Sequence, residues 1–307
     1  MKPKSKPKIC IGSWAYAVGP YKDNPMSLEE VCKGLHDLGF DGIELGAFKP
    51  HANPDLYPTK KDRERLKELF ERYELQTPAI SADLWAYPFA EGDPKIRKGY
   101  AEAFDRHLEL CVDVGIPTLR VDTLTYTPFP EKLDYNTTWD IIVETFQQDS
   151  DKARDVGIDI VWEFEPGFII NKPGEIVRLI GKVGRKNFSA LLDTSHVRMV
   201  AVVGSKQTAP KQTLLGGELE FIGMLKGNIG HVHLIDSDNT LYNNETSTHT
   251  PFGDGFIDFD AVLPAIVEAG YKSEWWSIDL YGWTDAWNVT QKCKRGLDNI
   301  LRRIGWI

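Results

Sequence analysis

The chain repeats one local pattern eight times: a short β-rich run followed by a stretch with helical periodicity. The predicted strands cover residues 8–13, 42–46, 77–82, 118–123, 159–165, 189–193, 230–234 and 275–280. Residues that commonly start helices stand between them, among them Ser27, Thr59, Pro94, Pro173 and Asp258. This strict alternation predicts a parallel sheet covered by helices.

Eight repeats without a glycine-rich phosphate-binding motif favour a closed (β/α)8 barrel, a TIM barrel, over a doubly wound open sheet. Because no linker interrupts the pattern, we expect one domain over residues 1–307, of which residues 1–7 form a short basic tail. In such barrels the functional groups stand at the C-terminal ends of the strands and in the loops that follow.

Charge and composition exclude several classes of partner. The net charge of −9 disfavours binding to nucleic acid, since no basic groove is apparent. No run reaches the roughly 18 apolar residues of a membrane span, and the basic tail lacks the apolar stretch of a secretory signal. The four cysteines are far apart and form no C-x-x-C pair. We therefore expect a cytoplasmic protein with reduced thiols.

Polar residues gather at the predicted C-terminal strand ends. They are Trp14, Glu44, Trp85, Asp122, Glu163, Glu165, Asp193, His196, His231, His233 and Asp279. Unpaired carboxylates are costly inside a barrel, and a bound cation is the simplest compensation. Carboxylate and imidazole together suit divalent Mn, Co, Zn or Fe.

Three short motifs then carry a family resemblance. Glu165-Pro166 ends the fifth run, Asp193-Thr-Ser-His196 ends the sixth, and His233 is followed by Asp236 after the seventh. In this order they resemble the xylose isomerase-like barrel superfamily, which includes sugar isomerases, ketose 3-epimerases, inosose dehydratases and apurinic endonucleases. The resemblance implies a TIM barrel and a divalent metal ion, with Mn²⁺ expected and Co²⁺, Zn²⁺, Fe²⁺ or Mg²⁺ as alternatives.

The resemblance also implies roles for individual residues. Glu165, Asp193, His233 and Asp279 are the expected metal ligands. Glu165, Asp279 and His196 are the expected catalytic residues, the first two as acid–base groups. His196 is expected to hold substrate hydroxyls or, as in some branches of the family, a second metal. Many family members carry Glu at the position of Asp279. The side chain of Asp279 is one methylene shorter, and we expect it to ligate the metal without reaching a substrate carbon, which argues against symmetric epimerisation. His249 resembles a metal histidine of the endonuclease branch, but its usual partner aspartate is Ser247 here.

The remaining candidates have a structural alternative. Trp14 and Trp85 are expected pocket walls, and the substrate-binding set further includes Glu44, His196, His231 and His249. Glu44 fits a salt bridge low in the barrel equally well, and His231 fits a supporting role behind the metal. Glu163 is expected to orient a neighbour, and Asp122 to pair with Arg120.

The leading functional hypothesis is a metal-dependent sugar isomerase or epimerase that abstracts a proton next to a carbonyl and passes through an enediolate. The close alternative is a lyase that acts on 3-keto-glycosides by β-elimination. A non-catalytic sugar-binding barrel and an apurinic endonuclease are weaker readings. The expected partner is a small sugar or glycoside, without a phosphate group. The polar loop 237–254 could be a lid or a subunit contact, and a homo-oligomer or a small partner subunit is possible.

Overall fold

The computed structural model describes residues 2–307, and its central feature is a parallel eight-stranded sheet. The strands follow the order β1-β10-β7-β6-β5-β4-β3-β2. Their bounds are β1 (Lys8–Ile11), β2 (Leu45–Gly46), β3 (Ile80–Ser81), β4 (Thr118–Val121), β5 (Asp159–Glu163), β6 (Phe188–Asp193), β7 (Ile229–Leu234) and β10 (Trp275–Ile278). A parallel bridge between Gly12 and Glu44 joins the β1 edge to the β2 edge, so that the sheet curls into a barrel.

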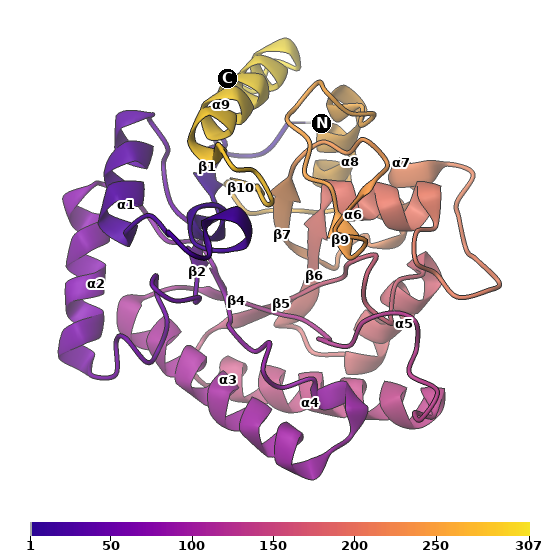
Figure 1. Cartoon of the computed structure of the whole chain (residues 1–307). Coiled ribbons are helices and arrows are strands. Elements are labelled where there is room, and N and C mark those ends of the chain that lie inside the picture. Colours follow the sequence, from indigo (N-terminus) through magenta and orange to yellow (C-terminus); the bar gives the residue numbers. More distant parts are fainter. Residues whose placement is uncertain (1) are drawn as a thin grey trace.

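Helices surround the strands, as Figure 1 shows. They are α1 (Leu28–Asp37), α2 (Lys60–Arg72), α3 (Pro94–Val114), α4 (Tyr135–Asp155), α5 (Pro173–Val183), α6 (Thr194–Arg198), α7 (Gly217–Met224), α8 (Phe259–Glu268) and α9 (Ala286–Arg303). The predicted (β/α)8 architecture is confirmed, since each of the eight predicted strand regions overlaps a strand of this sheet.

The predicted helix starts are also confirmed, for local chemical reasons. Ser27 and Thr59 each form a capping box with the residue three positions later, Glu30 and Asp62. Pro94 and Pro173 are the first residues of α3 and α5, where a missing N–H costs nothing. The expectation of a single domain over residues 1–307 stays a prediction.

One element of the structure was not expected. The loop after β7 contains an antiparallel hairpin, β8 (Leu241–Tyr242) and β9 (Thr246–Ser247), which crosses the C-terminal side of the barrel. Its loop residues Asn243 and Asn244 both have positive φ angles, a backbone conformation that asparagine tolerates in turns. The hairpin brings Glu245, Thr246 and Ser247 over the strand ends.

The core lies between the strands and the helices, where aromatic and aliphatic side chains are packed out of solvent. Phe146 of α4, for example, packs against Phe89, Trp162 and Phe188. Among residues 2–307, no helix has the length and apolar character needed to cross a membrane. The cytoplasmic location and the oligomeric state stay predictions.

Candidate metal centre and active site

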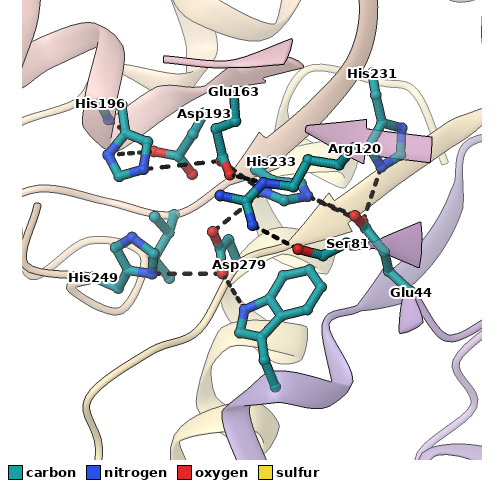
Figure 2. A network of polar contacts seen from close by, with 12 residues as sticks. Glu44, Ser81, Arg120, Glu163, Asp193, His196, His231, His233, His249 and Asp279 are labelled. Atoms are coloured by element: carbon teal, nitrogen blue, oxygen red, sulfur yellow. Dashed lines mark hydrogen bonds and ion pairs between the residues drawn. The ribbon is translucent and has the colours of Figure 1, made fainter. Parts of the chain in front are cut away.

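Four buried side chains converge at the C-terminal ends of neighbouring strands. Glu163 ends β5, Asp193 ends β6, His233 lies in β7, and Asp279 directly follows β10. Each offers one ligand atom, and these atoms all lie within 4.8 Å of one another (Figure 2). Three carboxylates and one imidazole that meet at one point are a donor set suited to a divalent transition ion.

The ring of His233 is held from behind by a carboxylate. Its Nε2 donates to Glu44, with N–O distances of 3.0 and 3.1 Å, while its Nδ1 faces Glu163 at 3.1 Å and Asp279 at 3.2 Å. His231 Nε2 donates to the same Glu44 carboxylate at 2.9 Å. Glu44 therefore orients His233 with Nδ1 toward the four-residue group, and His231 supports Glu44 from the far side (Figure 2).

Arg120 of β4 brings a guanidinium into this network. It forms ion pairs with Glu163 at 2.6 Å, Asp122 at 2.8 Å and Glu165 at 3.3 Å, and it donates to Ser81. The expected pairing of Asp122 with Arg120 is confirmed. Because Arg120 holds Oε2 of Glu163, the other oxygen of Glu163 is left to face His233.

The positions of the two glutamates of the Glu-x-Glu-Pro segment differ from those that the sequence suggested. Glu163, expected to orient a neighbour, stands in the four-residue group with Asp193, His233 and Asp279. Glu165, expected to be the ligand on this strand, stands outside that group and shares a separate one with Glu163 and His196. The reason is depth, since β5 ends at Glu163 and Glu165 lies two residues further toward the barrel mouth. This geometry favours Glu163 as the ligand.

Asp279 is engaged through both carboxylate oxygens. Trp14 Nε1 donates to Oδ1 at 2.8 Å, and His233 Nδ1 faces Oδ2 at 3.2 Å. His249 Nδ1 lies 3.6 Å from Oδ1. Trp14 is thus both a wall of the cavity and a direct partner of a candidate ligand.

His196 and His249 lie on the side of Asp193. The ligand atoms of these three residues form another close group, and His196 Nδ1 is 2.8 Å from the Ser247 hydroxyl. Both ring nitrogens of His249 are buried without a hydrogen-bond partner among the described residues. The structure therefore brings His249 close to Asp193 and His196, and the Ser247 hydroxyl contacts the ring of His196.

A cavity of about 520 Å³ opens above the group. Its lining comes from many loops and comprises Trp14, Val18, Lys22, Phe48, Asp83, Trp85, Arg120, Tyr126, Glu163, Glu165, His196, Glu245, Thr246, Asp279 and Tyr281. Trp85 is a wall as predicted, but Glu44, His231 and His249 do not line it. Tyr126, Glu245 and Tyr281 were not singled out from the sequence, because only the folded loops and the β8–β9 hairpin bring them there.

The electrostatics of the four-residue group suit the binding of a positive charge. Burial, together with Asp279 and Glu163, raises the pKa of Asp193 well above its ordinary value. Burial alone would lower the pKa of His233, yet Glu44, Glu163 and Asp279 raise it well above its ordinary value. Oδ2 of Asp193 is also buried, and no described residue forms a hydrogen bond with it. An unpaired carboxylate oxygen among the other three candidate ligands fits a divalent ion.

Glu165 differs from Glu163, the candidate ligand on the same strand, in its protonation. Burial and the charge of Glu163 raise the pKa of Glu165 to about 8, whereas Arg120 and His233 outweigh burial and lower the pKa of Glu163. Burial lowers the pKa of His196 to about 3, so that its imidazole is neutral. The cavity thus offers one carboxylate that can exchange a proton near neutral pH.

Comparisons with known proteins agree with this arrangement. A family model described as "Xylose isomerase-like TIM barrel" matches residues 32–297. The chain is 24% identical over 283 residues to an inosose dehydratase of Lacticaseibacillus casei, and the match covers 84% of each protein. It is 20% identical over 256 residues to a fructoselysine 3-epimerase of Escherichia coli O157:H7, covering 80% of this chain and 83% of that protein.

A solved structure supports the fold. The crystal structure of the IolI protein with a binding zinc atom superposes with a TM-score of 0.75 at 20% sequence identity, covering 97% of this chain and 99% of that one.

Proposed function

This chain belongs to the xylose isomerase-like TIM barrel family, and we propose that it is a divalent-metal-dependent enzyme that removes a proton next to the carbonyl group of a small sugar-like substrate. The observation that carries the proposal is the four-residue group of Glu163, Asp193, His233 and Asp279. Two of its members, Glu163 and Asp279, line the same cavity as the separate carboxylate Glu165. The sugar- and cyclitol-processing relatives support a substrate of that class.

The metal would be held by Glu163, Asp193, His233 and Asp279, with Glu44 fixing the tautomer of His233. A divalent ion at this point polarises a carbonyl group and makes the neighbouring C–H bond more acidic. We propose Mn²⁺ as the resident ion. Zn²⁺ is the first alternative, because the IolI structure contains a zinc atom.

Glu165 is the proposed general base. It lies outside the ligand group, lines the cavity, and has a pKa of about 8, near the pH at which a base accepts and returns a proton efficiently. Arg120 fixes the Glu165 carboxylate at 3.3 Å. His196, neutral and facing the same cavity, is placed to hold a substrate hydroxyl.

The reaction that fits a single base best is elimination. Two-base epimerisation needs a second free carboxylate on the opposite face of the carbon, and both oxygens of Asp279 are already engaged by Trp14 and His233. In an elimination, Glu165 takes the proton of the carbon next to the carbonyl and the C–O bond at the following carbon breaks. A C=C bond forms between the two carbons, and Glu165 returns the proton to the departing oxygen.

An isomerase or epimerase remains the second candidate. One base on one face can also return the proton to the neighbouring carbon, which is isomerisation. The similarity to a fructoselysine 3-epimerase supports keeping this reading open to experiment.

The test pairs two substitutions that lie two residues apart at one strand end. Glu163→Gln is expected to lose metal binding and activity, while Glu165→Gln is expected to bind metal normally and to lose proton exchange. The measurement is metal content by elemental analysis, together with NMR in D₂O on inososes, ketohexoses and 3-keto-glucosides. An unsaturated product supports elimination, and deuterium in a stereoisomer of the substrate supports epimerisation. Metal loss in Glu165→Gln but not in Glu163→Gln would overturn the assignment.

A further inference from the structure

The outer end of the cavity is not used by the proposed chemistry. The reacting carbon must lie at the inner end, beside Glu163, Glu165 and Asp279, where the wall residue Trp14 is only 7% exposed. Trp85 and Tyr126 line the same cavity but are 45% and 37% exposed. The cavity therefore runs from a buried polar floor to an open aromatic mouth.

The mouth carries an aromatic pair held by its surroundings. Trp85 follows β3 and Tyr126 follows β4, and their ring centroids lie 6.3 Å apart at an interplanar angle of 35°. Phe168 supports Tyr126 from the next loop at 5.1 Å, and a backbone bridge joins the same two residues. Exposed aromatic faces beside a sugar site suit the apolar C–H face of a sugar ring or the face of an aromatic ring.

The charges of the lining favour a neutral occupant. Five carboxylates line the cavity, from Asp83, Glu163, Glu165, Glu245 and Asp279, against the two cations Lys22 and Arg120. The guanidinium is already paired with Glu163 and Glu165. A phosphate or carboxylate group at the mouth would meet Asp83 and Glu245, whereas the hydroxyls of a neutral ring can donate to them.

The size of the cavity indicates room for more than one ring. Its volume of about 520 Å³ falls in the range of roughly 300–1,000 Å³ that holds drug-sized ligands. One sugar ring held at the inner end leaves the aromatic mouth empty.

We propose that the mouth is a subsite for a neutral second ring, a sugar or an aromatic aglycone, joined by a glycosidic bond to the ring held at the metal centre. The substrate is then a glycoside and not a free monosaccharide or a sugar phosphate. This inference rests on the proposed function, because it names the group whose oxygen departs in the elimination.

The experiment measures equilibrium binding to the metal-loaded protein by isothermal titration calorimetry, without turnover. The probes are matched pairs, the methyl and the phenyl β-glycosides of glucose, galactose and xylose. In at least one pair the phenyl glycoside is expected to bind about three- to tenfold more tightly, as one aromatic contact supplies. Trp85→Ala and Tyr126→Ala should each remove most of this preference and leave the methyl glycoside unaffected. Phe256→Ala is the matched control, because Phe256 is 63% exposed and does not line the cavity.

Equal affinity within every pair, absence of binding included, would overturn the subsite. The same holds if Phe256→Ala lowers the preference as much as Trp85→Ala does. The proposed function fails separately, through loss of metal dependence or of proton exchange, and neither readout depends on this binding ratio. Thermal melting of each variant identifies a folding defect. If Trp85→Ala or Tyr126→Ala does not fold, the binding ratio of the other variant tests the subsite.

Discussion

Glu44 makes a prediction about metal affinity although it is not one of the four candidate ligands. Glu44→Gln keeps the shape of the side chain and removes its charge. In the structure the Glu44 carboxylate accepts from His233 Nε2 at 3.0 Å and from His231 Nε2 at 2.9 Å. The substitution therefore weakens the contact that fixes His233 with Nδ1 toward Glu163 and Asp279.

The magnitude follows from the kind of hydrogen bond that is lost. A hydrogen bond to a charged acceptor contributes about 1.5–3 kcal/mol, and one between neutral groups about 0.5–1.5 kcal/mol. Replacing the carboxylate by an amide thus costs about 1–2 kcal/mol at His233. This corresponds to a loss in metal affinity of roughly 5- to 30-fold, close to the 10- to 100-fold typical of substitutions behind a metal ligand.

The assay is competition of the protein with a chromogenic chelator for Mn²⁺ and for Zn²⁺. His231→Asn is the matched control, since it removes the other partner of Glu44 and leaves the contact between Glu44 and His233 in place. We expect it to weaken metal binding less than Glu44→Gln does. A folded Glu44→Gln protein with unchanged affinity for both ions would refute the role given to Glu44, and so would a larger effect of His231→Asn.

Three further predictions concern stability and protonation. Burial raises the pKa of Asp149 to about 8. The free energy of unfolding should therefore fall by up to about 1.4 kcal/mol per pH unit as the pH rises from about 4 to about 8. Urea titrations at several pH values should show that Asp149→Asn removes this contribution to the slope. Phe146→Ala leaves a cavity in the aromatic core and should cost about 3–5 kcal/mol, measured by the same titrations. Because the pKa values of Asp193 and His233 are raised in the metal-free protein, metal uptake at neutral pH should release about one to two protons per ion and strengthen with pH, which calorimetry in buffers of different ionisation enthalpy measures.

The sequence predicts the barrel well, because the signals for its strands and helix starts are local. Capping boxes at Ser27 and Thr59 and the helix-starting prolines act through residues a few positions away. The β8–β9 hairpin was missed although Asn243-Asn244 is a turn signal, because its two strands have only two residues each. Such short strands depend on packing against the rest of the protein, which local sequence does not show.

The candidate site is harder to predict at the level of single residues. Strand alternation puts Glu163 and Glu165 on the same face and cannot tell which lies at the depth of Asp193. The register between β5 and β6 does not decide this by itself, because Glu163 pairs with Leu191, two residues before Asp193. The tilt of the strands in the barrel also sets the level of each side chain. Arg120 was expected to pair with Asp122, but its reach to Glu163 depends on the adjacency of β4 and β5 in the folded sheet.

The charge balance inside the barrel links these features. A network closed without a metal ion would need a partner for every buried carboxylate oxygen, and Asp193 Oδ2 has none among the described residues. Arg120 supplies one fixed positive charge, and it forms ion pairs with Asp122, Glu163 and Glu165. The protein without a metal ion compensates with protons, which is why the pKa values of Asp193 and His233 are raised. Both protons sit on candidate ligands, so a dication that displaced them would restore the balance at the point where the four side chains meet.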